Sequence, residues 1–166
     1  MSGQKIPEDC ILAALDLPDL VATKKFAARF GPLLKRGDVV ALDGSLGAGK
    51  TELCRAIIQG LGIPGDVPSP TFNLLQIYEP TSGGPPLWHL DLYRLERPEE
   101  AFELGIEEGF EAAVSLIEWP SKLGSYLPVG FLTFRLEIAA DGQARKLTII
   151  GDPAWKKRLQ GILGDD

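Results

Sequence analysis

A glycine-rich segment, Gly44 to Thr51, follows directly after the apolar run of residues 39–43. Its pattern of glycine, four residues, glycine, lysine and threonine is that of the Walker A phosphate-binding loop. Glycines adopt backbone conformations closed to other residues, so main-chain N–H groups can approach an anion. The apolar run predicts a strand, and the residues from Lys50 onward predict a helix whose N-terminus points at the same anion. The segment therefore predicts a phosphate site between a strand and a helix.

Within this loop, the side chains of two residues have expected roles. Lys50 can reach the terminal phosphates, and the Thr51 hydroxyl can hold a magnesium ion. The alternative is a glycine turn followed by an accidental Lys-Thr pair. If the loop binds a nucleotide, the residues expected to contact it are Ser45, Leu46, Gly47, Ala48, Gly49, Lys50 and Thr51.

The composition limits what the rest of the chain can be. Its 166 residues suit a single domain over residues 1–166, with residues 1–15 as an extra strand or a loose leader. The formal net charge of −6 argues against a dedicated nucleic-acid-binding surface. There is no apolar run of membrane-spanning length and no signal pattern, and the two cysteines do not suggest a disulfide framework. We therefore expect a cytoplasmic protein without membrane contact.

Periodicity and breakers predict the other elements. Asp19 is a candidate N-cap of a helix. A second helical stretch begins near Pro98, and Gly105 and Gly109 are expected to break it into short pieces. The remaining predicted elements are helices over residues 50–61 and 152–163 and strands over residues 72–78, 87–94, 114–117, 131–138 and 147–150, the first two of these strands forming a hairpin.

The strand predicted over residues 87–94 carries an unusual set of polar side chains. Alternation places His89, Asp91 and Tyr93 on one face, with apolar residues between them facing the core. Such a set suits a carboxylate that polarises water or steadies a metal, with an imidazole and a phenol orienting it. An ordinary half-exposed strand is an equally good interpretation. Because a lone histidine is more often structural, we place His89 second to Asp91 as a catalytic candidate.

Two further residues are candidates for the metal and the phosphates. Glu118 ends a short apolar strand, where an acid often faces Mg²⁺, although a solvated strand-end carboxylate gives the same pattern. Thr71 lies in a proline-stiffened loop and could complete the magnesium shell, or it could simply start a strand. Arg94 could neutralise phosphate charge, and an exposed strand-end arginine is equally plausible.

Four motifs in order resemble the bacterial TsaE (YjeE) family, over about Asp19 to Pro128. These motifs are Leu46–Thr51, Val67–Phe72, His89–Arg94 and Leu116–Pro120. The resemblance implies a P-loop α/β fold with a mixed sheet flanked by helices in three layers. It also implies that ATP is the nucleotide, with Lys50 and Thr51 as the phosphate and magnesium residues and Glu118 as the second magnesium-linked acid.

The resemblance further implies that Asp91 is the acid used in ATP hydrolysis and that Thr71 occupies a switch-like position. The family is the ATPase component of the machinery that makes N6-threonylcarbamoyladenosine in tRNA. It acts with TsaD, which carries the transfer, and with TsaB, so tRNA would be met only through that complex. Ser121 stands where many relatives have an acid. The adenine contacts are poorly defined by motif, with Asp16–Asp19 and Ser121 as candidates.

Two other functions fit the same loop. A small-molecule P-loop kinase would need an acceptor site and an arginine-rich lid, and few arginines lie near the candidate site. A nucleotide-gated binding protein without significant turnover would have the same motifs. A GTPase is disfavoured because no Asn-Lys-x-Asp run is present.

Overall fold

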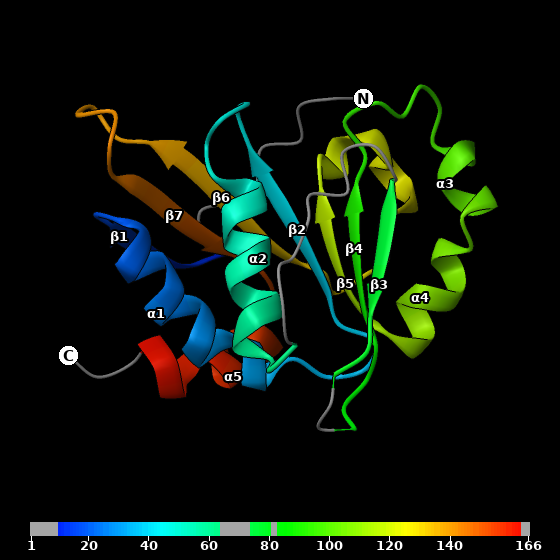
Figure 1. The fold of residues 1–166 in the computed structure, drawn as a ribbon, viewed down its shortest axis with the longest axis horizontal. Coiled ribbons are helices and arrows are strands. Elements are labelled where there is room, and N and C mark those ends of the chain that lie inside the picture. The colour runs from blue at the N-terminus through cyan, green and yellow to red at the C-terminus, as the bar shows by residue number, and fades with distance from the viewer. Residues whose placement is uncertain (1–9, 64–73, 81–82, 164–166) are drawn as a thin grey trace.

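The computed structural model describes residues 10–63, 74–80 and 83–163. A seven-stranded sheet in the order β1-β7-β6-β2-β5-β4-β3 runs through the described part of the chain (Figure 1). Its strands are β1 (Ile11–Leu17), β2 (Val39–Gly44), β3 (Leu75–Tyr78), β4 (Leu87–Asp91), β5 (Val114–Glu118), β6 (Leu132–Ile138) and β7 (Arg145–Ile150). β2 is parallel to both of its neighbours, and β4 is parallel to β5, whereas β1, β3 and β7 are antiparallel additions. The expected mixed sheet is confirmed.

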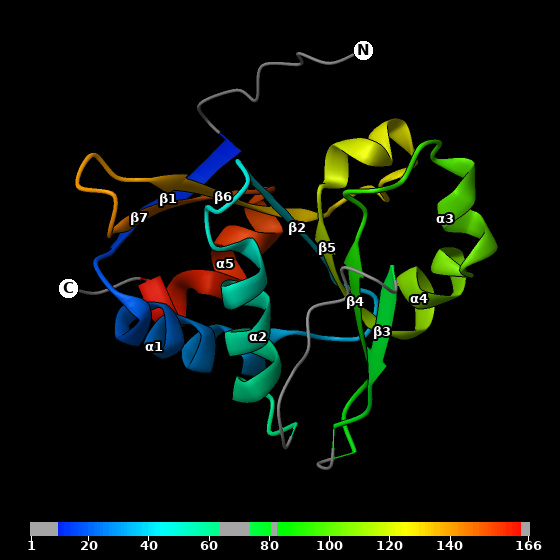
Figure 2. The same ribbon diagram turned by 45° about the horizontal axis from the view of Figure 1, so that its top comes forward.

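Helices cover both faces of this sheet. Two of them, α1 (Leu20–Phe30) and α2 (Lys50–Gly60), pack side by side, and α5 (Pro153–Leu163) joins their apolar cluster (Figure 2). A second cluster on the other face holds α3 (Glu99–Glu103) and α4 (Ile106–Ala112). The expected three-layer α/β architecture is therefore present. None of the helices in the described ranges is long and apolar enough to cross a membrane.

Several local expectations are confirmed. Asp19 caps α1, because its Oδ1 accepts a hydrogen bond from the Ala22 N–H at 2.9 Å. The hairpin of β3 and β4 is present, and Gly105, with φ +80°, separates α3 from α4. Of the first fifteen residues, Ile11–Leu15 lie within β1, and residues 1–9 lie outside the described ranges.

Gly109 does not break its helix as expected. It lies inside α4, where a Cβ atom would approach the Trp88 ring to 2.4 Å. Glycine is therefore needed for the close packing of α4 on β4, and helical hydrogen bonds continue through it. The predicted helix break at Gly109 is therefore wrong, and close packing against Trp88 explains why a glycine stands there.

The strand predicted over residues 87–94 ends earlier, at Asp91, because the chain turns with a hydrogen bond from Leu95 N–H to the Leu92 carbonyl. The alternation holds: Trp88, Leu90 and Leu92 pack with the α3–α4 cluster. The opposite face is buried too, since His89 has no exposed surface and Asp91 is 7% exposed. A half-exposed strand is therefore excluded.

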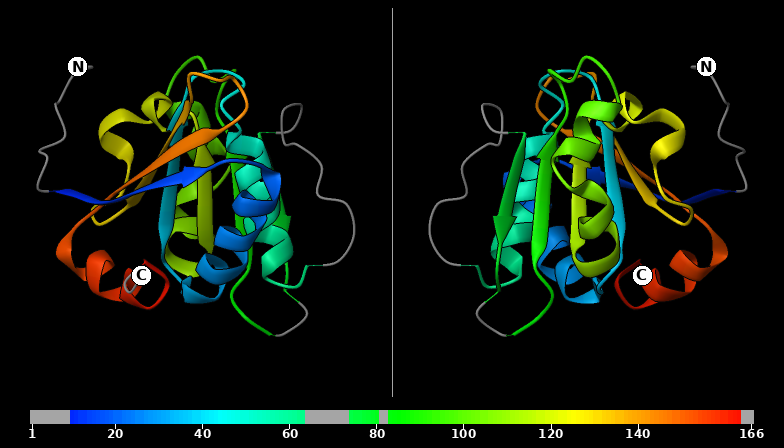
Figure 3. Two further views of the ribbon diagram at one scale, coloured as in Figure 1. Left: turned by 90° about the vertical axis from the view of Figure 1, so that its left-hand side faces the viewer. Right: turned by 90° about the vertical axis from the view of Figure 1, so that its right-hand side faces the viewer.

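The sheet brings four connecting segments to one end of the molecule. The carboxyl ends of β2, β4 and β5 and the start of α2 lie at the top of Figure 1. The connection from β6 to β7 lies at the same end in Figure 3, and Arg145 at the start of β7 contacts the loop that precedes α2. Ligands of open α/β sheets bind beyond the carboxyl ends of the strands.

Candidate functional site

The loop between β2 and α2 has the backbone of a phosphate-binding turn. Gly44, Gly47 and Gly49 have φ values of +152°, +83° and +103°, which side chains with a Cβ atom rarely adopt. A Cβ atom on Gly44 would lie 2.6 Å from the Leu136 carbonyl oxygen. The loop ends directly at the N-terminus of the eleven-residue helix α2. Free N–H groups and the helix dipole therefore face the same space.

The expected phosphate-contact residues differ in their exposure. Leu46 is the exposed tip of the loop at 71%, whereas the Ala48 side chain is fully buried. Neither side chain offers a polar group to an anion, and the Ala48 N–H donates to the Ser45 carbonyl at 3.1 Å within the loop. The loop residues between the strand and Lys50 are Ser45, Leu46, Gly47, Ala48 and Gly49.

Lys50 lies over the loop with 5% of its surface exposed. Its Nζ donates to the carbonyl oxygens of Gly44 at 2.5 Å and Ser45 at 3.0 Å. The ammonium also lies 3.9 Å from the centroid of the Trp119 ring, a cation–π contact. Burial lowers the pKa of Lys50, and the carboxylates of Glu118, Asp43 and Asp91 oppose that shift. A phosphate would supply the counter-charge that this buried cation favours.

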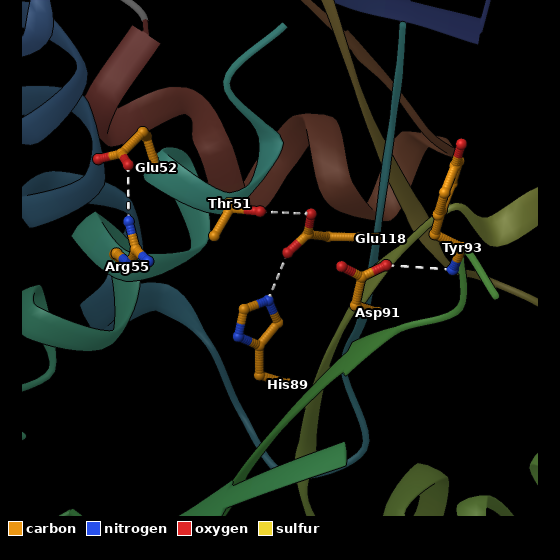
Figure 4. Close-up of polar contacts among 7 residues, drawn as sticks. All are labelled: Thr51, Glu52, Arg55, His89, Asp91, Tyr93 and Glu118. Atoms are coloured by element: carbon orange, nitrogen blue, oxygen red, sulfur yellow. Dashed lines mark hydrogen bonds and ion pairs between the residues drawn. The ribbon is translucent and has the colours of Figure 1, made fainter. Parts of the chain in front are cut away.

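A hydrogen-bonded chain joins three of the candidates (Figure 4). The Thr51 hydroxyl donates to Oε1 of Glu118 at 2.8 Å, and Nε2 of His89 lies 2.7 Å from Oε2 of the same carboxylate. Glu118 is 2% exposed, so a solvated strand-end acid is excluded. A hydroxyl beside a carboxylate is a set of hard oxygen ligands that suits Mg²⁺. The two residues expected to hold magnesium therefore fit that ion.

Asp91 lies beside Glu118, because β4 and β5 pair these two residues in register. Its Oδ1 accepts a hydrogen bond from the Tyr93 N–H at 3.1 Å. Burial raises the pKa of Asp91, the nearby Glu118 carboxylate adds to the shift, and the Tyr93 N–H opposes it. A buried carboxylate with a raised pKa is a better proton acceptor than an exposed one.

The expected orientation of Asp91 by its neighbours is only partly correct. The His89 imidazole contacts Glu118, and Figure 4 draws no hydrogen bond from it to Asp91. Tyr93 acts through its backbone, while its ring packs on Trp119 at 5.0 Å between centroids and is 47% exposed. Strand alternation put these side chains on one face, but the register with β5 decides which carboxylate the histidine meets.

Among the described residues, a hollow adjoins the loop on each of two sides. One, of about 380 Å³, lies between the loop and the ends of β4 and β5; it is lined by Leu46, Gly47, Gly49, Lys50, Thr51, Glu52, Asp91, Tyr93, Arg94, Glu118 and Trp119. The other, of about 160 Å³, lies between the starts of α1 and α2 and the β6–β7 connection. Arg94 thus lines the first hollow and Asp19 the second. Ser121 lines neither of these two, and Thr71 lies outside the described residues.

Arg145, at the start of β7, is a residue that the sequence analysis missed. Its Nε donates to the Ala48 carbonyl at 2.9 Å, so it ties the β6–β7 connection to the loop. The same guanidinium donates to the carbonyls of Gln143 and Ala144 at 3.0 and 3.1 Å. No motif marks it, because a basic residue at a strand start has many ordinary explanations.

This fold and this site define a P-loop protein of the α/β class. The family model described as "Threonylcarbamoyl adenosine biosynthesis protein TsaE" matches residues 17–147, and the chain belongs to this family. A Haemophilus influenzae protein named "tRNA threonylcarbamoyladenosine biosynthesis protein TsaE" is 36% identical over 149 residues, 86% of this chain and 92% of the relative. A Rickettsia bellii protein of the same name is 42% identical over 120 residues, 72% of this chain and 82% of the relative.

A solved structure has the same fold. The crystal structure of Bacillus subtilis YdiB superposes with a TM-score of 0.74 at 28% sequence identity. The match covers 90% of this chain and 92% of the YdiB chain. The resemblance stated from the four motifs is therefore confirmed for the family and for the fold.

Proposed function

We propose that this protein is the ATP-binding and ATP-hydrolysing component of threonylcarbamoyladenosine (t6A) synthesis in tRNA. The observation that carries the proposal is the meeting of Lys50, Thr51, Glu118 and Asp91 around one hollow beside the phosphate loop. Family membership supplies the pathway, and the site supplies the chemistry. On this proposal the protein does not perform the transfer itself.

In the proposed reaction, the loop N–H groups and Lys50 hold the β- and γ-phosphates of ATP. Thr51 and Glu118 hold Mg²⁺, which neutralises charge on the phosphates when bound. Asp91 orients the attacking water and accepts its proton, while a bond forms from the water oxygen to the γ-phosphorus and the bond to ADP breaks. The raised pKa of Asp91 supports this role. Thr71 is proposed to reach the γ-phosphate from its loop.

We place the nucleoside end of ATP in the second hollow. Asp19 and Gly49 both line it, so it adjoins the outer side of the phosphate loop. This position supports the earlier expectation that residues at the start of the first helix contact adenine. Arg145, which lines the same hollow, would lie beside the nucleoside.

The proposed partners are TsaD and TsaB, with tRNA reached only through their complex. The net charge of −6 agrees with a protein that does not itself hold tRNA. Leu46 and Tyr93, which are 71% and 47% exposed, form an apolar rim on the first hollow that suits a protein surface. We also propose that the chain is one cytoplasmic domain over residues 1–166.

Reconstitution with TsaD, TsaB, tRNA and ATP tests the function. Wild-type protein should support repeated rounds of t6A formation and release inorganic phosphate. An Asp91→Ala variant should bind ATP but lose both hydrolysis and modification, while Glu96→Gln, which changes an exposed carboxylate, should behave as wild type. Modification at the wild-type level by Asp91→Ala would refute the role of Asp91.

The same reaction separates the alternatives. Phosphate transferred to a small metabolite, with none released to water, would indicate a kinase. ATP binding that supports modification without any hydrolysis in a single turnover would indicate a nucleotide-gated binding protein. A pull-down of TsaD and TsaB with ATP, with ADP and without nucleotide tests the partners directly.

A further inference from the structure

His89 lies in the middle of the site but has no part in the hydrolysis proposed above. It is the single histidine of the chain, and it has no exposed surface. β4 carries it between β3 and β5, where it pairs in register with Gln76 and Leu116. Its Nε2 lies 2.7 Å from Oε2 of Glu118. Figure 4 shows the ring directed at this carboxylate.

The hydrogen bonds of Glu118 determine which nitrogen of His89 carries the proton. An ionised carboxylate only accepts hydrogen bonds. Oε1 of Glu118 accepts from the Thr51 hydroxyl, and Oε2 therefore accepts from Nε2–H of His89. In the described part of the chain, the buried Nδ1 has no hydrogen-bond partner. A histidine that served only the core would be expected to satisfy both nitrogens.

We propose that His89 is a positioning residue for the metal-binding acid. Its Nε2–H holds Oε2 of Glu118, which turns Oε1 towards the Thr51 hydroxyl and the magnesium ion beside it. This inference rests on the proposed function, because that function supplies the magnesium. Without the donor, the hydrogen bond from Thr51 alone holds the Glu118 carboxylate. The side chain can then rotate away from Thr51 to another rotamer. Partners that orient metal ligands in this way typically change metal affinity about 10- to 100-fold when they are mutated.

A metal site of a different kind is the alternative for this cluster. Ligand atoms of Cys54, His89 and Glu118 lie within 4.8 Å of one another, and all three residues are buried. However, Nε2 of His89 and Oε2 of Glu118 already pair with each other at 2.7 Å, and Oε1 of Glu118 pairs with the Thr51 hydroxyl at 2.8 Å. The hydrogen-bonded pair of His89 and Glu118 therefore explains the cluster without an ion at its centre.

Two amide variants separate positioning from mere packing. The Gln side chain places its NH₂ near the position of Nε2, whereas the shorter Asn places it near Nδ1. ADP affinity is measured by calorimetry over a series of Mg²⁺ concentrations and again in EDTA. For His89→Asn we expect the Mg²⁺ concentration that gives half of the Mg²⁺ effect on ADP affinity to rise about 10-fold. The ADP affinity in EDTA should change less than twofold. His89→Gln should recover most of the wild-type Mg²⁺ dependence.

Cys54→Ala is the matched control, because it changes a buried neighbour of the same carboxylate. It should leave the Mg²⁺ dependence unchanged. A folded His89→Asn variant with the wild-type Mg²⁺ dependence would overturn the inference, and so would a loss of Mg²⁺ response in Cys54→Ala as large as in His89→Asn. If wild-type protein itself shows no Mg²⁺ dependence, the proposed function fails instead, so the two failures are distinguishable.

Nitrogen NMR of the untagged wild-type protein tests the same inference without a variant. One histidine per chain gives one set of imidazole signals. The inference predicts the tautomer with the proton on Nε2, and a shift of this signal when Mg²⁺ is added to the ADP complex. A proton on Nδ1, or a signal that Mg²⁺ leaves unmoved, would contradict it.

Discussion

The two sides of the phosphate loop are built differently. On the β4–β5 side, parallel strands end in the two carboxylates that are buried among the described residues, Asp91 and Glu118. On the β6–β7 side, an antiparallel pair packs apolar side chains and sends one cation, Arg145, to the loop backbone. The difference indicates that one side performs the chemistry, while the other holds the loop in shape and borders the proposed nucleoside site. Mutations on the two sides should therefore affect different steps.

Lys50→Ala should have the largest effect, because it removes the buried cation that lies over the phosphate loop. We expect nucleotide affinity to fall about 100-fold or more, since hydrogen bonds to charged groups contribute roughly 1.5–3 kcal/mol each. Calorimetry with ADP and ATP measures it, with circular dichroism to check folding. Unchanged nucleotide affinity in a folded variant would show that the loop does not bind the nucleotide.

Asp91→Asn tests the chemical side alone. Hydrolysis should fall about 100-fold or more, the usual contribution of a general base, while ATP affinity stays within about threefold. Wild-type hydrolysis should also decline as the pH falls through the raised pKa of Asp91, because the protonated form cannot accept a proton. Single-turnover phosphate release measures both effects. If Asp91→Asn lost ATP affinity but kept the wild-type rate of hydrolysis, Asp91 would belong to nucleotide binding and not to the chemical step.

Arg145→Ala tests the structural side. Because the guanidinium holds the Ala48 carbonyl, its loss should loosen the loop and weaken nucleotide binding about 3- to 10-fold. Hydrolysis at saturating ATP should change less than twofold. Lys146→Ala, an exposed neighbour on the same strand, is the control and should bind as wild type. If Arg145→Ala slowed ATP hydrolysis more than it weakened nucleotide binding, the β6–β7 side would take part in the chemical step, contrary to this comparison.

The smallest expected effect concerns stability. Burial raises the pKa of Asp91, so the folded state disfavours its charge and loses stability as the pH rises above the unfolded-state value of about 4. Asp91→Asn should therefore raise the melting temperature at pH 7–8, by about 1–3 °C. The difference should shrink as the pH falls and vanish below about pH 4. A lower melting temperature at neutral pH would mean that the charge is stabilising.

The sequence predicted the chemical side better than the structural side. The sequence pattern from Gly44 to Thr51 by itself predicts the backbone of a phosphate-binding turn. Asp91 and Glu118 stand at the ends of short strands. These signals are local, so they survive without knowledge of the fold. Most strand and helix limits followed from the same local patterns, whereas the mixed sheet was implied by the family resemblance.

The remaining features depend on contacts between distant segments. The partner of His89 is decided by the register of β4 against β5, and Arg145 contacts Ala48, which lies 97 positions earlier in the sequence. The prediction for Gly109 was wrong because the glycine is required by contact with the Trp88 ring, which lies on a different element. Neither periodicity nor propensity contains such information. Thr71, which lies outside the described residues, stays a prediction.

A crystal structure with Mg²⁺ and a non-hydrolysable ATP analogue tests the central claim most directly. We expect the phosphates to lie in the loop in contact with Lys50, the ion to lie between Thr51 and Glu118, and Asp91 to face the γ-phosphate. An analogue seated away from the loop, or an ion that neither Thr51 nor Glu118 approaches, would contradict it.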